Sequence, residues 1–375
     1  MKITLDAGPF RDAVTWAARG LPNRSTTQMQ VLGGMLIEAA ENGTVTLSVF
    51  DYETSRRATV PGRVHTPGRV LVGGRILAAV VDETAGDHVD LTVDGTKLAV
   101  SCGSLEARLP TMADGDYPRL PALPAPVGAV QADALADTVA RVACAAGKDD
   151  TLPVLTAVLL QATAGQPLRL AATDRYRLAV ADLPWDCQLD QADPATVLVP
   201  AATLADAAKT AVGTVTVHAG TGASGEGLFG LAWADRWTTT RLVDGAFPPY
   251  EKFMIDNDKL AGSIHVDRDG LLAALKRVKP AAAKTSPLGI EVADWRMRLT
   301  QNSGQGEEIT DSLGAECDLP EVTFHVNPAY LRDALTATSG PVVHVGHVDY
   351  GRPIRITGDD PDSYTHILMP IKVSS

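Results

Sequence analysis

The chain reads Leu71-Val72-Gly73-Gly74-Arg75-Ile76-Leu77, and two later stretches repeat this pattern: Leu198-Val199-Pro200-Ala201-Ala202-Thr203-Leu204 and His325-Val326-Asn327-Pro328-Ala329-Tyr330-Leu331. Each joins a short β-like run to a segment in which apolar residues recur every three to four positions, as on one face of a helix. The stretches begin 127 residues apart (198 − 71 and 325 − 198). A unit of that length is the size of a whole domain, so the pattern predicts one domain fold present three times.

Each repeat contains two amphipathic helical segments set among alternating strands. We expect the first helical segments over 10–24, 131–148 and 268–284, and the second over 74–83, 201–212 and 327–338. Strands dominate the remainder, so each domain is predicted to be α+β, with an antiparallel sheet and two helices. The domains are placed at 1–126, 127–255 and 256–375.

The charge of the chain is unevenly distributed. The formal net charge is −12, which by itself argues against nucleic-acid binding because phosphate requires a positive surface. The six expected helical segments, however, hold 13 basic and 8 acidic residues, a net +5, so the rest of the chain carries −17. The sequence therefore predicts helices that form a positive surface on an acidic protein.

Composition excludes several other classes. No apolar run reaches the ~18 residues that suggest a membrane span, and residues 1–6 alternate like a strand instead of forming a signal peptide. The four cysteines lie far apart without a CxxC motif, which favours a reducing cytoplasm and argues against a structural zinc site. We expect no metal, no cofactor and no membrane partner.

Two short motifs suggest chemistry, but both have simpler interpretations. Residues 220–225 match GxGxxG, yet a dinucleotide site needs a helix next, and residues 226–233 are strand-like. A hairpin loop is favoured, and a nucleotide-dependent enzyme remains the alternative that a helix after Gly225 would support. His344 and His347 are three apart in an alternating strand, so they should face opposite sides and not share a metal. No catalytic residue is predicted.

Several local motifs occur in an order typical of one protein family. They are Leu109-Pro110-Thr111-Met112 with Asp116-Tyr117-Pro118, Thr173-Asp174-Arg175-Tyr176-Arg177-Leu178-Ala179, Leu242-Val243-Asp244-Gly245-Ala246-Phe247-Pro248, and Met369-Pro370. With them, essentially the whole chain resembles the bacterial DNA polymerase III beta subunit, the sliding clamp. The alanine-rich composition and the run Phe50-Asp51-Tyr52-Glu53 resemble actinobacterial members.

The resemblance implies three tandem DNA-clamp (processivity-fold) domains and a head-to-tail homodimer. Helices would line the inner face of the ring and antiparallel sheets the outer face. Such a ring encircles double-stranded DNA without reading its sequence and confers processivity without catalysis. The alpha subunit of DNA polymerase III, the clamp loader and repair polymerases would bind through a short linear motif.

The resemblance also assigns three sets of residues. The DNA-facing candidates are Arg24, Arg75, Arg141, Lys148, Lys209, Lys276, Arg277, Lys279 and Lys284. The partner-peptide pocket would comprise Leu155, Thr173, Arg175, Tyr176, Arg177, Leu178, Pro248, Lys252, Phe253, Pro353, Met369, Pro370 and Ile371. The dimer interface would include Ala107, Leu109, Ala281 and Ala282.

Some positions depart from the family pattern. Arg175 stands where glycine or a small residue is usual, and Phe253 is larger than the usual aliphatic residue. These residues suggest a variant or second-copy clamp whose reshaped pocket tolerates a pocket-binding inhibitor. Small residues at 280–283 and 107 replace bulkier apolar ones at the dimer contact, which leaves open a clamp-fold scaffold that no longer loads on DNA.

Overall fold

The structure is a computed structural model that describes residues 1–22, 30–189, 195–221, 227–282, 286–304, 306–319, 321–349 and 351–372. The α-helices are α1 (Ala7–Ala18), α2 (Gly74–Asp82), α3 (Ala132–Ala143), α4 (Ala201–Thr210), α5 (Arg268–Val278) and α6 (Pro328–Ala337). The strands of the first repeat are β1 (Lys2–Asp6), β2 (Gly34–Ala39), β3 (Thr44–Phe50), β4 (Thr54–Thr66), β5 (Gly68–Gly73), β6 (His88–Asp94), β7 (Lys97–Cys102) and β8 (Leu105–Met112). Those of the second are β9 (Pro126–Gln131), β10 (Ala157–Ala162), β11 (Leu168–Thr173), β12 (Arg177–Leu183), β13 (Asp186–Cys187), β14 (Ala195–Pro200), β15 (Thr214–Thr221), β16 (Gly227–Trp233) and β17 (Arg236–Arg241). Those of the third are β18 (Gly262–Asp267), β19 (Leu288–Ala293), β20 (Arg296–Asn302), β21 (Glu308–Cys317), β22 (Glu321–Val326), β23 (Val342–His347), β24 (Ile354–Thr357) and β25 (Tyr364–Leu368).

The order of these elements is the same in all three repeats. Each runs strand, helix, four strands, helix, three strands, and the second repeat adds the short β13. The second helices begin at Gly74, Ala201 and Pro328, which preserves the 127-residue spacing of the sequence pattern. The predicted threefold repeat and the α+β class are therefore confirmed.

The chain forms two compact units. One comprises residues 1–131 and 211–242, and the other comprises 132–210 and 243–375. The sheet of the first unit has the strand order β1-β6-β7-β8-β5-β2-β3-β4-β17-β16-β15-β9, and that of the second has β14-β10-β11-β12-β25-β24-β23-β18-β21-β20-β19-β22. The second repeat is shared between the units because β17 pairs with β4 and β12 pairs with β25, so each sheet continues from one repeat into the next.

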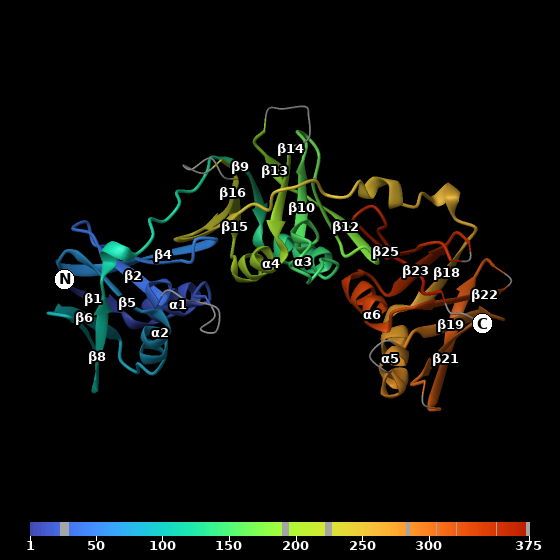
Figure 1. The fold of residues 1–375 in the computed structure, drawn as a ribbon, viewed down its shortest axis with the longest axis horizontal. Helices are drawn as coiled ribbons and strands as arrows, with labels where there is room; N and C mark the ends of the chain where they lie inside the picture. Colours follow the sequence, from blue (N-terminus) through green and yellow to red (C-terminus); the bar gives the residue numbers. More distant parts are fainter. Residues whose placement is uncertain are drawn as a thin grey trace. The chain divides into compact units, whose positions relative to one another are not determined.

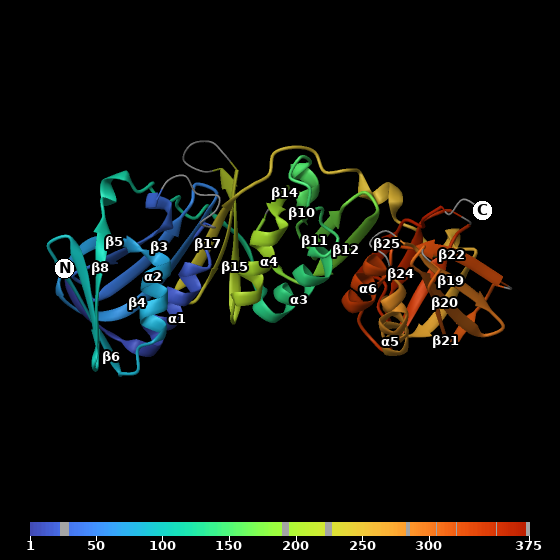
Figure 2. The ribbon, with the colours of Figure 1, turned by 60° about the horizontal axis from the view of Figure 1, so that its bottom comes forward.

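Pairs of helices cover the sheets on one side. Within the first unit α1 lies beside α2 against β3 and β4, and within the second α3 lies beside α4 and α5 beside α6 (Figures 1 and 2). The buried residues of the helices recur at helical spacing, as with Phe10, Val14 and Ala17 in α1 or Leu135, Val139 and Val142 in α3. Burying each such leucine, valine or phenylalanine stabilises the fold by roughly 1.5–3 kcal/mol, which fixes the helices on the sheet.

The first helices are shorter than expected, and this corrects the charge prediction. They end at Ala18, Ala143 and Val278, so Arg19, Lys148 and Lys279 lie beyond their C-terminal ends, as Arg24 and Lys284 do in the sequence. The six observed helices hold 8 basic and 7 acidic residues, a net +1 instead of +5. Arg19 and Lys279 are the residues directly after α1 and α5, where a cation interacts favourably with the helix dipole.

The same loop joins two strands in repeats one and two. Asp51 and Asp174 each accept hydrogen bonds at Oδ1 from the backbone N–H groups two and three residues later, at 2.7–3.1 Å. The residue after each aspartate, Tyr52 or Arg175, has φ +78°. The loop at Asp51 in repeat one therefore has the same backbone conformation as the loop at Asp174 in repeat two.

The glycine motif lies in a hairpin. Residues 222–226 fall outside the described residues, but β15 before them and β16 after them pair as antiparallel neighbours, from Thr216↔Ala232 to Thr221↔Gly227. Strand β16, and not the helix that a dinucleotide site requires, follows the glycine motif, so the structure favours the hairpin loop over a dinucleotide-binding site at residues 220–225.

The two histidines of β23 have different neighbours. His344 contacts His265 with 2.7 Å between the two Nδ1 atoms, whereas His347 packs by Phe324. Within the described residues there is no cluster of three or more His, Cys, Asp or Glu side chains able to hold a metal ion. All four cysteines are free. Among the described helices, each is too short or too polar to cross a membrane.

Candidate functional site

Two adjacent cavities in the second unit bring together parts of repeats two and three. The smaller one, here called the apolar pocket, has a volume of about 240 Å³. It is lined by Thr173, Arg175, Arg177, Leu178, Pro248, Tyr250, Phe253, Pro353, Ile367 and Met369. The β11–β12 loop, the segment after β17, the start of β24 and the end of β25 thus form its wall.

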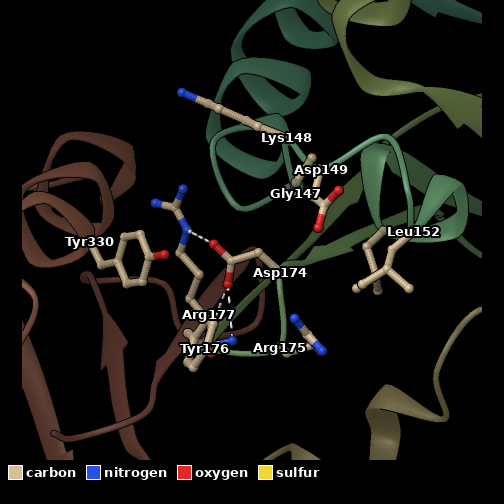
Figure 3. Close-up of a pocket in the computed structure, with 11 residues that line it drawn as sticks. Gly147, Lys148, Asp149, Leu152, Asp174, Arg175, Tyr176, Arg177 and Tyr330 are labelled. Atoms are coloured by element: carbon tan, nitrogen blue, oxygen red, sulfur yellow. Dashed lines mark hydrogen bonds and ion pairs between the residues drawn. The ribbon is translucent and has the colours of Figure 1, made fainter.

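The larger cavity, here called the polar pocket, has a volume of about 460 Å³. Its walls are Ala146, Gly147, Lys148, Asp149, Leu152, Leu155, Asp174, Arg175, Tyr176, Arg177 and Tyr330 (Figure 3). Arg175 and Arg177 line both cavities, so the β11–β12 loop forms the partition between them. Tyr176, Phe253 and Met369 are 57%, 55% and 41% exposed, so these cavities carry exposed apolar side chains of the kind found at interaction surfaces.

Most residues of the predicted peptide pocket lie in these two cavities. Thr173, Arg175, Arg177, Leu178, Pro248, Phe253, Pro353 and Met369 line the apolar pocket, and Leu155 and Tyr176 line the polar one. Lys252 and Pro370 line neither. Ile371 lines a separate cavity of about 540 Å³ beside α5 and α6, where its N–H donates to the carbonyl of His325.

Sequence reasoning missed several wall residues. Tyr250 and Ile367 belong to the apolar pocket. The sequence features that could have identified them are the run Phe247-Pro248-Pro249-Tyr250 for Tyr250 and the strand-like alternation of β25 for Ile367. Tyr330 reaches the polar pocket from α6, in a different repeat. No local pattern marks such a residue, because its role depends on packing between distant segments.

Arg177 is held at the partition by two ion pairs and one aromatic contact. Its side chain is 6% exposed and donates from Nε to Asp174 Oδ2 at 2.9 Å and from Nη1 to Asp333 Oδ2 at 2.8 Å. The guanidinium also lies over the Tyr330 ring, 4.2 Å from its centroid, a cation–π contact (Figure 3). Burial alone would lower the pKa of Arg177, but the hydrogen bonds and charges of Asp333 and Asp174 raise it above its usual range. The positive charge of Arg177 is therefore matched by two carboxylates.

A buried polar layer lies behind this partition. Tyr364 and His366 of β25 share a hydrogen bond of 2.7 Å between the phenol oxygen and Nδ1. Burial lowers the pKa of His366 to about 3, so the imidazole is neutral. Burial likewise raises the pKa of the Cys144 thiol to about 11, which keeps it protonated and unreactive.

The candidate DNA-facing residues differ in exposure and in the ion pairs and hydrogen bonds that they form. Lys148, Lys209, Lys276 and Lys279 are exposed. Arg141 pairs with Asp137 at 2.6 Å and Arg277 with Asp311 at 2.5 Å. Arg75 donates to the carbonyls of Leu21 and Pro22 in the segment that follows α1. Arg24 and Lys284 lie outside the described residues.

The candidate dimer residues lie on β8 and after α5. Ala107 and Ala282 are half-buried, whereas Leu109 and Ala281 are only 6% and 3% exposed and pack within their own repeat. Ala107 and Ala282 are thus the members of this set that a second copy can reach.

Helix-covered antiparallel repeats that share their sheets, with an apolar pocket where repeats two and three meet, define a DNA-clamp protein. Family models for the N-terminal, central and C-terminal domains of the DNA polymerase III beta subunit match residues 1–121, 129–249 and 258–372. The chain belongs to the DNA polymerase III beta subunit family of sliding clamps.

Individual relatives agree. The chain is 34% identical to the beta sliding clamp of Streptomyces coelicolor over the full length of both, and 38% identical to that of Micrococcus luteus over 85% of this chain and all of the relative. It is also 34% identical to the beta sliding clamp homolog GriR of Streptomyces muensis, covering 90% of this chain and 88% of that protein. The crystal structure of the Thermotoga maritima beta subunit superposes with a TM-score of 0.88 at 26% identity, covering 100% of both chains.

Proposed function

We propose that two copies of the protein close head to tail into a ring around duplex DNA and hold polymerases on it without catalysing a reaction. The observation that carries this proposal is a strand pairing between consecutive repeats. It occurs between repeats one and two and between repeats two and three, but no described strand pair joins repeat three to repeat one. β4 of repeat one pairs with β17 of repeat two, and β12 of repeat two pairs with β25 of repeat three. The strands at the corresponding places of the remaining pair are β21 and β8.

β21 and β8 have free edges in the described part of the chain. Residues 308–314 of β21 pair with β20 on one side only, and residues 105–110 of β8 pair only with β7. An unpaired edge exposes a row of N–H and C=O groups that bind another strand. Pairing β21 of one copy with β8 of the next satisfies both edges, repeats the geometry of the internal joints, and places Ala107 in the contact.

The remaining functional assignments follow from this assembly. We place the domains at 1–126, 127–255 and 256–375, in line with the matched family domains. The exposed lysines 148, 209, 276 and 279 are assigned to weak DNA contacts that permit sliding. The two pockets are assigned to linear motifs of polymerase and clamp-loader subunits, since exposed apolar rims around a cavity suit short anchored peptides. The protein is assigned to the cytoplasm.

Sedimentation combined with DNA retention tests the ring. We expect a dimer of about twice 39.4 kDa at micromolar concentration and, after loading, retention on nicked circular duplex that is lost on linearisation. Ala107→Arg should raise the dimer dissociation constant at least tenfold because it adds a charge to a strand edge. Ala202→Arg, at an exposed helix position, is the matched control. A monomer at tens of micromolar, or equal retention on both DNA forms, would contradict the ring and favour a clamp-fold scaffold.

A second candidate function is a variant clamp that tolerates a pocket-binding inhibitor. Arg175 and Phe253 both line the apolar pocket, which supports this proposal. Similarity to GriR, and to a Pseudomonas aeruginosa clamp crystallised with griselimycin (TM-score 0.90, 22% identity, 100% of both chains), is consistent with it. Titration of the purified protein with griselimycin tests it. Affinity at least tenfold weaker than that of the P. aeruginosa clamp is expected, and equal affinity would rule the variant function out.

A further inference from the structure

Repeat three contains a further cavity, of about 540 Å³, beside the neighbouring helices α5 and α6 (Figures 1 and 2). Its volume lies in the range typical of sites for small molecules. We call it the α5–α6 cavity. Its described wall consists of Leu272, Leu275, Lys276, Val278, Lys279, Ala282, Ser286, Gln301, Asn327, Pro328, Ala329, Arg332, Thr336 and Ile371.

A buried amide belongs to this wall. Gln301 follows Met297 and Leu299 on the core face of β20 and is 0% exposed, at a position where strand alternation predicts an apolar residue. Its Nε2 donates to Ser286 Oγ at 2.7 Å and to the carbonyl of Pro287 at 3.2 Å, which fixes the orientation of the amide. Its Oε1 is buried and has no hydrogen-bond partner among the described residues. Buried polar atoms nearly always have a partner, so Oε1 is the amide atom available to a donor on a ligand.

The charged side chains of the wall are all basic. Lys276, Lys279 and Arg332 belong to it, and none of its described residues is an aspartate or glutamate. Arg332 pairs with Asp333, outside the wall, at 2.9 Å, whereas the exposed Lys276 and Lys279 form no ion pair within the described ranges. The two lysines are three positions apart and therefore lie on the same side of the helical segment. Such a wall favours an anionic group, above all a phosphate with its nearly two negative charges.

The remaining wall residues limit the ligand further. Leu272, Leu275 and Ile371 offer apolar surface on which a flat or hydrophobic body can pack. A nucleotide combines such a body with a phosphate and an N–H donor, because each base has a donor on its pairing edge. A fatty acid lacks the donor, and inorganic phosphate lacks the body. Nucleotides are therefore the class of ligand that fits all three features of the wall.

We propose that the α5–α6 cavity binds one nucleotide, with its phosphate against Lys276 and Lys279 and its base donating to Gln301 Oε1. The site consists of residues of repeat three alone and does not require the ring. The nucleotide comes either from solution or from the unpaired end of a DNA strand, and the second source rests on the clamp function proposed above. A bound nucleotide covers two of the lysines assigned to DNA contacts, so it competes with duplex DNA.

Equilibrium dialysis of the full-length protein with three probes tests the phosphate and the donor separately. The probes are dAMP, deoxyadenosine, and dAMP with two methyl groups on N6. We expect dAMP to bind at least about tenfold more tightly than deoxyadenosine, because the phosphate forms charge-assisted hydrogen bonds. We expect it to bind about threefold to tenfold more tightly than the dimethylated form, which has no N–H to donate to Oε1.

Variants assign these differences to particular residues. Lys276→Gln and Lys279→Gln should each weaken dAMP binding by about threefold or more and leave deoxyadenosine binding unchanged. Gln301→Leu should remove the difference between dAMP and its dimethylated form. Since both probes are first compared on the unmodified protein, the role of Oε1 is tested even where this variant fails to fold. Arg298→Gln is the matched control, because Arg298 is an exposed cation of β20 that lies outside the wall.

The outcomes separate the site from the ring. Binding of dAMP no tighter than that of deoxyadenosine, or equal binding of dAMP and its dimethylated form, overturns the nucleotide site and leaves the clamp intact. A monomeric protein that still distinguishes the three probes overturns the ring and supports the site.

Competition with DNA identifies the source of the nucleotide. One duplex carries a single unpaired terminal adenine nucleotide, and a second, of equal length and charge, carries an abasic unit there. Displacement of dAMP about threefold better by the first supports a strand end as the ligand. Equal displacement overturns the strand end and leaves the free nucleotide.

Discussion

The Arg177 side chain joins β12 to Asp333 on α6, 156 positions later in the sequence, through the 2.8 Å hydrogen bond from Nη1 to Oδ2. This contact connects the wall shared by the apolar and polar pockets to α6 of repeat three. Since Asp174 binds the same guanidinium, removing the arginine leaves two carboxylates near each other without a cation.

We expect Arg177→Ala to destabilise the protein by about 3 kcal/mol or more, because breaking a buried ion pair leaves uncompensated charge. Urea unfolding of the full chain measures the change. Arg169→Ala is the matched control: Arg169 pairs with Asp182 at 2.7 Å, but its side chain is 48% exposed, so it should cost about 1 kcal/mol or less. Similar losses in the two variants would show that the Arg177 network is not special.

The buried imidazole of His366 should make stability depend on pH. Burial lowers its pKa from 6.5 to about 3 in the folded protein, so only the unfolded chain takes up the proton between these values. Stability is fully present above pH 6.5 and is lost as the pH falls towards 3. From pH 6.5 to 5 the loss from this group is about 2 kcal/mol.

His366→Asn keeps an acceptor for the Tyr364 hydroxyl and should flatten the pH dependence of the unfolding free energy between pH 7 and 5. Some dependence remains, because burial also lowers the pKa values of His344 and His347. His65→Asn, at an exposed position, should change nothing. A slope equal to that of the unmodified protein in His366→Asn would refute the assignment.

The turn between β19 and β20 offers a stabilising substitution. Asp294 and Trp295 have φ values of +51° and +61°, as in a type I′ hairpin, where Asp-Gly is favoured. Trp295 is 69% exposed and therefore has few contacts to lose. Trp295→Gly should raise stability by about 1 kcal/mol by relieving the left-handed strain. Trp295→Ala, which keeps the strain, should show no gain in thermal unfolding. Equal effects of the two substitutions would contradict this explanation.

The exposed Lys276 and Lys279 should contribute to DNA binding more than Arg277, which pairs with Asp311. Lys276→Gln and Lys279→Gln should each reduce the slope of log K against log salt by about 1, as expected when one phosphate contact is lost. Arg277→Gln should have a smaller effect, because its guanidinium already pairs with Asp311. Fluorescence titration with duplex DNA at several salt concentrations provides the measurement. A larger change for Arg277 than for the lysines would reverse the ranking.

Periodicity was sufficient to predict the repeats, because the starts of α2, α4 and α6 depend on local apolar spacing and keep the same offset. The C-terminal ends of the first helices were less predictable. Residues 143–146 are Ala-Cys-Ala-Ala, which contain no glycine or proline to mark the end of α3 at Ala143. The overestimate of helical charge followed from these ends.

The residues that line the two pockets were likewise predicted only in part. The Thr173–Leu178 loop was identified through its motif, and its backbone follows from Asp174 accepting the next N–H groups. Tyr330 and the partner Asp333 were not identified, because both reach the loop across more than 150 residues, where sequence spacing carries no information. The left-handed conformation of Arg175 was also unpredictable, since arginine is not a residue that normally marks it.

The edges of β8 and β21 have one more consequence. Because they belong to different strands, the proposed contact between copies is heterologous, and a heterologous contact closes only when the rotation from one copy to the next completes a circle. Otherwise each copy binds the next through the same contact and an open filament grows. Substitutions that alter the angle of the β4–β17 or β12–β25 joints should therefore convert closed dimers into open filaments, which electron microscopy would distinguish.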